Sequence, residues 1–193
     1  MTVLVVVRKN NKVVIAADTA TSYGSTLKDA EYKGNHDKII RFKNTWFALT
    51  GFSMGKLMLN HALEDHGKDL SFNGLSEIYR STLKLHKVFK DEYYLMTKKG
   101  NGNNQAVENM QLHMLIANAS GIYEVTGDRN VSEVSKFWAA GSGSRFAIGA
   151  MHSSYDRFKN PAKIAEAGIE AACRFDAHCK LPLTLHQCQL KDA

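Results

Sequence analysis

The sequence is sparing in cysteine and has no long apolar run, and both absences exclude classes of protein. Its 193 residues include three cysteines, Cys173, Cys179 and Cys188, all in the last fifth of the chain. An odd count in a chain of this size does not suit a disulfide framework, so we expect free thiols, a reducing compartment and a cytoplasmic protein. No segment approaches the ~20 apolar residues of a membrane span, and the short apolar run after Met1 lacks the pattern of a signal peptide. A membrane protein and a disulfide-stapled secreted protein are therefore both excluded.

A concentrated basic segment is also lacking. The net charge is +6, but the lysines and arginines are scattered along the chain and form no basic run. We interpret them as a solvated basic surface and expect no nucleic-acid partner. Hydrophobic residues make up 44% of the chain and charged residues 23%, which is typical of a soluble globular protein long enough to bury a core.

What is present is a regular order of strands and helices. The apolar patterns predict paired strands, two helices, more strands, two further helices and a last strand. Polar, glycine-rich segments at 19–37 and 98–105 predict an irregular surface loop and an exposed loop. The predicted strands are 3–7, 12–17, 38–42, 45–50, 110–118, 122–126, a short segment near 132–139, and 183–190, and the predicted helices are 54–62, 75–89, 144–157 and 162–176.

Paired helices between blocks of antiparallel strands do not suit a parallel, doubly wound sheet. They favour an α/β (α+β) fold in which two antiparallel sheets pack face to face between helices, a four-layer αββα sandwich. The sequence has no internal repeat, linker or low-complexity segment. We therefore predict a single domain over residues 1–193.

The first two strands give a geometric constraint. Asn10-Asn11 tolerate the positive φ of a two-residue hairpin turn. Such a turn places Thr2 opposite Asp18 and Thr19 in the strand ladder. An acid at a strand end is usually a turn former or a helix cap, so this placement alone assigns no function to Asp18.

Thr2 itself carries a possible chemistry. Methionine aminopeptidase removes Met1 before a small residue such as threonine, which leaves Thr2 with a free α-amine. An α-amine has a pKa near ~7.7–8.0, in the right range for a base at neutral pH. A threonine hydroxyl activated by its own amine is one of the recognised nucleophiles of covalent catalysis. A retained Met1 would acylate the amine that this chemistry needs.

Several short motifs then follow in order. The block TVLVVVRKNNKVVIAAD at 2–18 and the helix leading to Asp176 enclose Tyr23-Gly24-Ser25-Thr26, Gly34-Asn35-His36-Asp37-Lys38, Leu49-Thr50-Gly51-Phe52 and Ala140-Gly141-Ser142-Gly143. Each motif is weak alone, but the ordered set spans nearly the whole chain. It resembles the proteasome-like threonine peptidases of the Ntn-hydrolase superfamily, and is especially similar to bacterial HslV and to proteasome β subunits.

The resemblance implies a role for each matching residue. Thr2 matches the nucleophile, and Asp18 matches the acid that supports the neighbouring lysine. Lys38 matches the lysine whose charge favours the oxyanion form of the threonine and assists proton transfer. Gly51 matches the residue whose backbone N–H forms the oxyanion hole, where one lost donor typically costs about 2.7–4 kcal/mol of barrier. Ser142 resembles the serine near the threonine amine.

The resemblance also implies a site-closing segment at Asp176-Ala177-His178-Cys179. In the bacterial enzyme this loop offers backbone carbonyls to a monovalent cation, so Asp176 and Cys179 become candidates for a structural Na⁺. Here His178 replaces a tyrosine and Cys179 replaces a serine. No other cofactor is expected.

The partners that the resemblance implies are further copies of the chain, stacked as a double ring of six or seven subunits per ring. The implied substrate is a peptide or an unfolded protein, with a possible ATP-dependent unfoldase. Several departures from HslV are visible: Ala17 replaces a glycine, Met54-Gly55 replaces Gly-Gly, and the loop between Asp18 and Lys38 is longer. They favour a separate branch, such as the β-proteobacterial proteasome homologue.

Three alternatives stay open. One is a ring-forming subunit of the same fold that does not cleave, and another is an Ntn amidase acting on a small molecule. The third is a zinc site, although the paired ligand spacing of such sites is absent. Its candidate ligands are Cys173, His178, Cys179, His186 and Cys188.

Overall fold

The computed structural model describes residues 1–97 and 107–191. The chain opens with a hairpin of β1 (Leu4–Lys9) and β2 (Lys12–Asp18). Asn10 and Asn11 form the turn with φ of 51° and 57°, the left-handed values that a type I′ turn requires. The predicted hairpin and its register are confirmed, with Leu4 paired to Ala17.

The hairpin is the centre of a four-stranded antiparallel sheet with the order β10-β1-β2-β11. β10 (Phe137–Ala140) pairs with β1, and the last strand, β11 (Leu183–Gln189), pairs with β2. Helices α3 (Ser144–Tyr155) and α4 (Pro161–Phe175) cover one face. The Asn160 side chain caps α4 and Pro161 occupies its first turn, which explains why this helix begins there.

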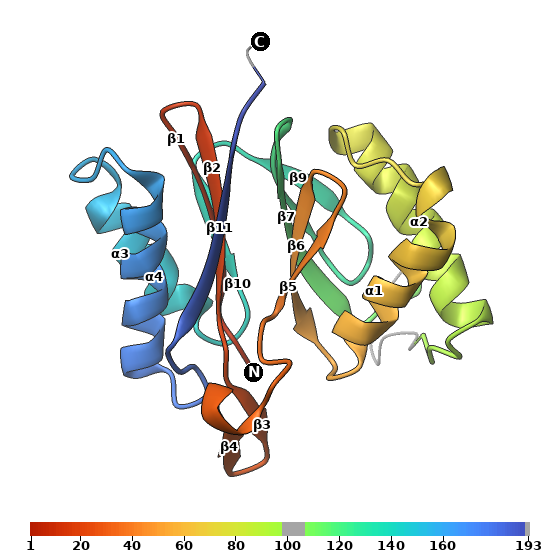
Figure 1. Cartoon of the computed structure of the whole chain (residues 1–193), viewed down its shortest axis with the longest axis horizontal. Helices are drawn as coiled ribbons and strands as arrows, with labels where there is room; N and C mark the ends of the chain where they lie inside the picture. Colours follow the sequence, from red (N-terminus) through yellow and green to blue (C-terminus); the bar gives the residue numbers. More distant parts are fainter. Residues whose placement is uncertain (98–106, 192–193) are drawn as a thin grey trace.

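The second sheet has five strands in the order β5-β6-β7-β8-β9, all antiparallel. Helices α1 (Gly55–His66) and α2 (Leu75–Asp91) cover its outer face (Figure 1). The strands are β5 (Ile39–Phe42), β6 (Thr45–Gly51), β7 (Leu112–Asn118), β8 (Gly121–Val125) and β9 (Val131–Val134).

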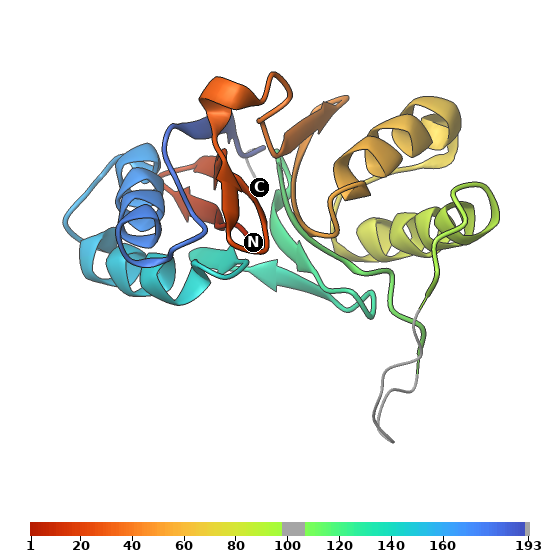
Figure 2. The ribbon, with the colours of Figure 1, turned by 90° about the horizontal axis from the view of Figure 1, so that it is seen from below.

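The two sheets pack against each other between the two pairs of helices (Figures 1 and 2). Alternate residues of β1 explain why its apolar run is continuous: Val5 and Val7 pack towards α3 and α4, while Leu4 and Val6 pack against the other sheet. A strand buried on both faces has no polar side to alternate. The predicted four-layer αββα sandwich is confirmed, and the N-terminus lies between its two sheets (Figure 2).

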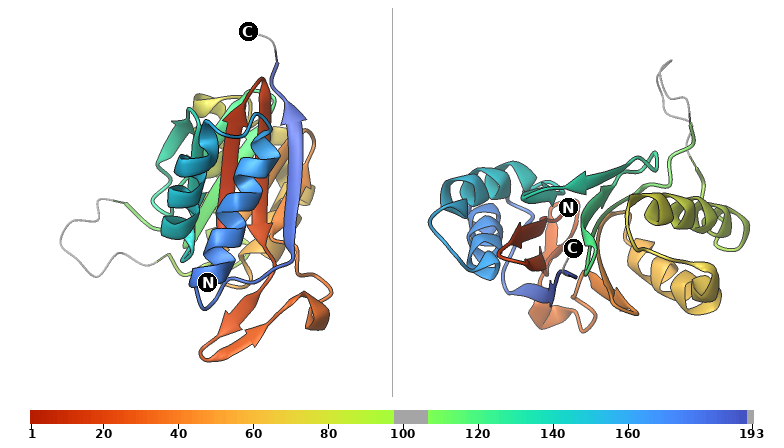
Figure 3. Two further views of the ribbon diagram at one scale, coloured as in Figure 1. Left: turned by 90° about the vertical axis from the view of Figure 1, so that its left-hand side faces the viewer. Right: turned by 90° about the horizontal axis from the view of Figure 1, so that it is seen from above.

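Two of the sequence predictions were wrong in detail. The segment 19–37 is not wholly irregular, since it forms a small hairpin of β3 (Thr21–Tyr23) and β4 (Thr26–Lys28), followed by a 3₁₀ turn η1 (Ala30–Tyr32). Figure 3 shows that this hairpin projects beyond the main sheets. Its strands are too short and polar to show an apolar period.

The segment near 132–139 is not one strand but two, because β9 and β10 belong to different sheets. The chain crosses from one sheet to the other between Val134 and Phe137. A sequence pattern cannot reveal that change, since both pieces are extended. The exposed loop predicted at 98–105 lies outside the described residues. Of the helices described, none has the length and apolar character needed to cross a bilayer.

Candidate active site

Thr2 is a buried residue two positions before the start of β1, with 3% of its surface exposed. The β1–β2 ladder continues past Leu4, because the Asp18 N–H donates to the Val3 carbonyl at 3.2 Å. The Thr2 hydroxyl in turn donates to Asp18 Oδ1. The hairpin register therefore brings Thr2 and Asp18 into contact, as the sequence predicts.

Asp18 is fully buried and is the most heavily hydrogen-bonded side chain of the site. A buried carboxylate is tolerated when its oxygens are satisfied in this way. Oδ1 accepts from the Thr2 hydroxyl, the Val3 N–H at 2.9 Å and Lys38 Nζ at 2.6 Å, and Oδ2 accepts from the N–H groups of Ala20 at 3.2 Å and Lys180 at 3.3 Å.

Lys38 stands directly before β5, the edge strand of the other sheet, and reaches across to the first. Its ammonium group donates to both Thr2 Oγ1 and Asp18 Oδ1. Burial lowers the pKa of Lys38, and the attraction of Asp18 opposes that shift. Lys38 is thus a positive charge on the Thr2 oxygen that gives up a proton more readily than a surface lysine does.

Ser142 approaches Thr2 from the turn after β10. Its Oγ accepts from the Thr2 N–H and donates to the Thr2 carbonyl, both at 3.3 Å. Gly141 has a φ of +94°, and an added Cβ there would collide with the Thr2 carbonyl oxygen. The Gly143 N–H also donates to that carbonyl at 3.2 Å. The Gly-Ser-Gly turn therefore holds the Thr2 backbone closely.

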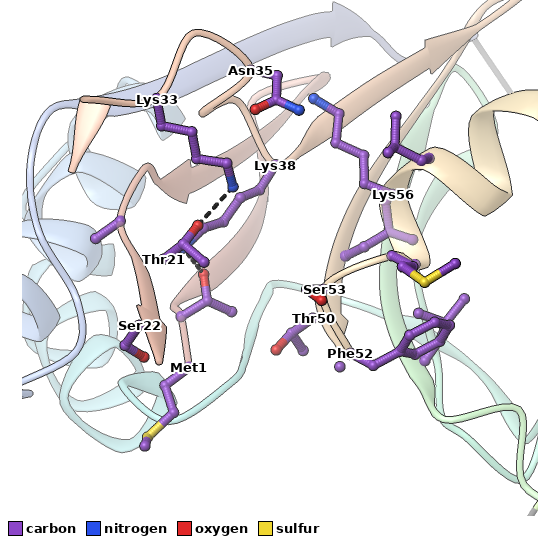
Figure 4. Close-up of a pocket in the computed structure, with 18 of the residues that line it drawn as sticks. Met1, Thr21, Ser22, Lys33, Asn35, Lys38, Thr50, Phe52, Ser53 and Lys56 are labelled. Atoms are coloured by element: carbon purple, nitrogen blue, oxygen red, sulfur yellow. Dashed lines mark hydrogen bonds between the residues drawn. The ribbon is translucent and has the colours of Figure 1, made fainter. Parts of the chain in front are cut away.

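Gly51 ends β6 and lines the same pocket as Thr2. Its φ is +137°, and an added Cβ would collide with the Gln111 carbonyl oxygen, so the position requires glycine. The pocket has a volume of about 440 Å³. Figure 4 shows Thr50, Phe52 and Ser53 facing Met1 and Ser22 from the opposite side of this pocket.

Asp176 is not brought into contact with the nucleophile. It follows α4, where its Oδ1 accepts from the His178 N–H at 2.8 Å and its carbonyl accepts from the Cys179 N–H at 3.3 Å. Among the described residues it makes no hydrogen bond to Thr2 or Ser142. A monovalent cation on the Asp176 and Cys179 carbonyls stays a prediction.

The cysteines and histidines near the C-terminus do not assemble into a metal site. Within residues 1–97 and 107–191, no three histidine, cysteine or acidic side chains are grouped to hold a metal ion. His186 instead stacks on Trp46, with ring centroids 3.9 Å apart. All three cysteines are free thiols, and Cys179 is buried. The structure therefore gives the zinc alternative no support.

Sequence reasoning missed two contributors to the site, the backbone N–H groups of Ala20 and Lys180 on Asp18. It also missed that Lys33 and Lys56 line the pocket. Backbone donors carry no side-chain signal in a sequence. The two lysines come from a loop and from a helix start, which only the tertiary fold brings together.

No family model matches the chain. Thiobacillus denitrificans BPH is 33% identical, with a TM-score of 0.92 over 99% of this chain and 100% of that one. The same protein in complex with epoxomicin gives 33% identity and a TM-score of 0.88 over 98% of this chain and 100% of that one.

A more distant likeness is to the eukaryotic HslV of Trypanosoma brucei. It is 18% identical, with a TM-score of 0.70 over 97% of this chain and 99% of that one, and this likeness concerns the fold alone. The identity to BPH, by contrast, extends over the full length of that protein. The chain therefore belongs to the proteasome-like Ntn-hydrolases, in the β-proteobacterial branch that BPH represents.

Proposed function

We propose that the chain is a threonine endopeptidase that cleaves peptide bonds through an acyl-enzyme on Thr2. The observation that carries the proposal is the pair of contacts on one atom: Thr2 Oγ1 is in hydrogen-bond contact with both Asp18 and Lys38. A hydroxyl beside a buried carboxylate and a lysine of lowered pKa is suited to lose its proton. Membership of the proteasome-like family agrees with this chemistry.

In this proposal, removal of Met1 exposes the α-amine of Thr2 as the base. Thr2 Oγ1 attacks the scissile carbonyl carbon, and the hydroxyl proton passes through water to the amine. The carbonyl oxygen becomes an oxyanion and accepts a hydrogen bond from the Gly51 N–H, the donor that the family resemblance implies. The C–N bond then breaks, the leaving amine takes the proton from the Thr2 amine, and an ester on Thr2 remains.

The second half of the reaction repeats these roles with water as the nucleophile. The Thr2 amine takes a proton from the water, whose oxygen attacks the ester carbonyl. The ester C–O bond breaks, the peptide acid leaves, and Thr2 Oγ1 regains a proton. Lys38 stabilises the Thr2 oxygen as negative charge develops, and Asp18 holds the ammonium group of Lys38 in place. Ser142, hydrogen-bonded to the Thr2 nitrogen, positions the base.

The test is covalent labelling followed by kinetics. After intact mass has established that Met1 is absent, a peptide epoxyketone such as epoxomicin should add to the wild-type protein at Thr2 and not to Thr2→Ala. Peptide hydrolysis by Thr2→Ala should fall at least about 1000-fold, as for other lost nucleophiles. Thr82→Ala is the matched control, since Thr82 is buried in α2 and its hydroxyl donates to the Ile78 carbonyl, away from the pocket.

Two results would overturn this proposal in favour of the alternatives. A Met-free protein that forms no adduct and cleaves no peptide is a non-catalytic subunit of the same fold. A protein that forms the adduct but hydrolyses only small amides is an Ntn amidase. Each outcome is visible in the same set of assays.

We further propose that the active form is a homo-oligomer, a stacked double ring of six or seven subunits per ring, in the cytoplasm. The support is the family and, for the compartment, the three free cysteines. Unfolded proteins, delivered by an ATP-dependent unfoldase, are the proposed natural substrates. Light scattering of the purified protein measures the assembly, and a monomer at working concentration would contradict it.

A further inference from the structure

Two lysines other than Lys38 line the pocket beside Thr2. Lys33 lies between η1 and β5, and Lys56 is the second residue of α1. Both side chains are half-buried. Figure 4 shows Lys33, Asn35 and Lys56 together around one end of the pocket, away from Met1 and Thr50. The ammonium group of Lys56 lies beside Asn35 and that of Lys33 beside Thr21, both on the part of the pocket away from Met1.

Neither lysine is neutralised by a nearby acid. Lys56 Nζ donates to the carbonyl oxygen of Asp37, and Lys33 Nζ donates to Thr21 Oγ1 at 2.7 Å. Both acceptors are uncharged, and within the described residues neither ammonium group forms an ion pair. An ammonium group has three N–H donors, so each lysine keeps capacity for another acceptor.

Asp37 also lines the pocket, but its carboxylate forms hydrogen bonds with other residues. Its Oδ1 accepts from the Ile39 N–H at 2.8 Å and from Thr184 Oγ1 at 3.0 Å. Its Oδ2 lies 4.0 Å from His186 Nε2. These contacts join Asp37 to β5 and β11, which leaves the two lysines without a carboxylate of their own.

Within the described residues, the positive charge at this end therefore has no ion-pair partner, and the carboxylate of Asp37 offsets it only in part. Burial lowers the pKa of Lys56, Asp37 opposes that shift in part, and the nearby charge of Lys33 adds to it. The pKa of Lys38 is lowered mainly by burial and to a smaller extent by the charge of Lys33, so Lys33 acts on both of the other lysines. Helix α1 begins at this pocket without a side-chain cap, so the positive end of its dipole adds to the positive potential there.

The position of Lys33 and Lys56 relative to Thr2 determines which part of a bound substrate lies next to them. Thr2 and Gly51 both line this pocket, so in the proposed reaction the carbonyl attacked by Thr2 Oγ1 is held between them. The side chain of the residue that supplies that carbonyl is attached at the adjacent carbon. It is therefore the part of the substrate that enters the cavity towards Lys56 and Lys33.

We propose that this pocket selects an acidic side chain, aspartate or glutamate, at the substrate residue that supplies the scissile carbonyl, with Lys56 as its principal partner. The inference rests on the proposed peptidase function and names its substrate class. A substrate carboxylate in the pocket would accept charge-assisted hydrogen bonds from these ammonium groups, which no carboxylate of the described residues accepts. Apolar neighbours such as Leu49 and Leu112 pack against the aliphatic part of the side chain.

The experiment compares fluorogenic peptides that are identical except for glutamate, glutamine, leucine or lysine before the scissile bond. The wild-type protein should hydrolyse the glutamate peptide with a kcat/KM at least about tenfold above its glutamine isostere, the size of one charged hydrogen bond. Lys56→Met should bring this ratio close to one, and Lys56→Arg should retain most of it. Lys68→Gln, an exposed lysine of the 3₁₀ turn η2 (Gly67–Asp69), should keep the wild-type ratio.

A binding measurement separates this inference from the proposed function. Fluorescence anisotropy of Thr2→Ala with labelled peptide amides ending in glutamate or glutamine reports the pocket without any cleavage. Preferred binding of the glutamate peptide, lost in Thr2→Ala with Lys56→Met, supports the pocket even if no peptide is cleaved. Active protein that prefers the leucine or glutamine peptide overturns the acidic preference and leaves the peptidase proposal intact.

Discussion

The pocket has two charged regions that use lysine in opposite ways. In the nucleophile region (Thr2, Asp18, Lys38 and Ser142), the ammonium group of Lys38 contacts a buried carboxylate at 2.6 Å. In the cationic region (Lys33, Asn35, Asp37 and Lys56), the two ammonium groups donate to neutral oxygens and form no ion pair within the part of the chain that the structure describes. Charged groups that pair with each other, as Lys38 and Asp18 do, are a fixed part of the fold. Charged groups without such a partner, as Lys33 and Lys56 are within the described residues, are suited to bind a ligand of opposite charge.

The strongest test of this contrast compares the two carboxylates. Asp18→Ala leaves Lys38 buried without its counter-charge and deprives three backbone N–H groups of their acceptor. We expect a loss of about 3–5 kcal/mol in the free energy of unfolding in urea. Asp37→Ala removes a carboxylate whose side chain is 38% exposed and that holds two neutral donors, so about 0.5–2 kcal/mol is expected. Equal losses would contradict the division into two regions.

As with the two carboxylates, replacing the lysine of the nucleophile region should cost more stability than replacing the lysine of the cationic region. Lys38→Met removes the ammonium group from Asp18 and from the Thr2 oxygen, so we expect about 1.5–3 kcal/mol less stability. Peptide hydrolysis should fall at least about 100-fold, since proton transfer at Thr2 loses its charged neighbour. Lys56→Met removes a charge that burial disfavours and should leave the free energy of unfolding equal or higher. A large loss of stability in Lys56→Met would show that its charge is already satisfied.

A smaller effect is expected at the edge of the nucleophile region. Ser142 is exposed but bonds the Thr2 nitrogen and carbonyl, so Ser142→Ala should lower kcat/KM about tenfold while changing stability by less than about 1 kcal/mol. Ser153→Ala is the matched control, because Ser153 is an exposed serine of α3 whose hydroxyl donates to the Ala150 carbonyl of its own helix. If both variants keep full activity, Ser142 does not position the Thr2 amine.

Much of the nucleophile region could be predicted from local sequence. The β-branched runs around Asn10-Asn11 fix a hairpin, and the period of two in its ladder then brings Thr2 beside Asp18. The placement of Lys38 beside Thr2 could not be predicted from local sequence, because it depends on the packing of one sheet against the other. Family resemblance supplied that step, and the contact of Lys38 with Thr2 and Asp18 agrees with it.

The cationic region had no such signal. Lys56 belongs to α1 and Lys33 to a loop, and neither position differs in sequence from an ordinary solvated lysine. What makes them neighbours is the approach of the small β3–β4 hairpin and its following loop to the start of α1 around the pocket. The strands of that hairpin are three residues each, too short for periodicity to reveal. Local patterns predicted the contact between Thr2 and Asp18, whereas the grouping of Lys33 and Lys56 arises only in the tertiary fold.

The smallest expected effect concerns alkaline pH. The pKa of Lys56 is lowered from its ordinary value of 10.5, so between its folded pKa and 10.5 the unfolded state binds more protons than the folded state. Stability attributable to Lys56 therefore rises with pH in that window. Measured by urea unfolding in steps from pH 7 to about 10.5, wild type should gain stability relative to Lys56→Met, in which the shifted group is absent. Lys38 is present in both proteins, so its own lowered pKa cancels in the difference.

Lys68→Met corrects for the removal of one positive charge from the surface. A wild type that loses stability relative to Lys56→Met as pH rises would show that Lys56 is stabilised in its charged form, and the cationic region would then resemble the nucleophile region instead of contrasting with it.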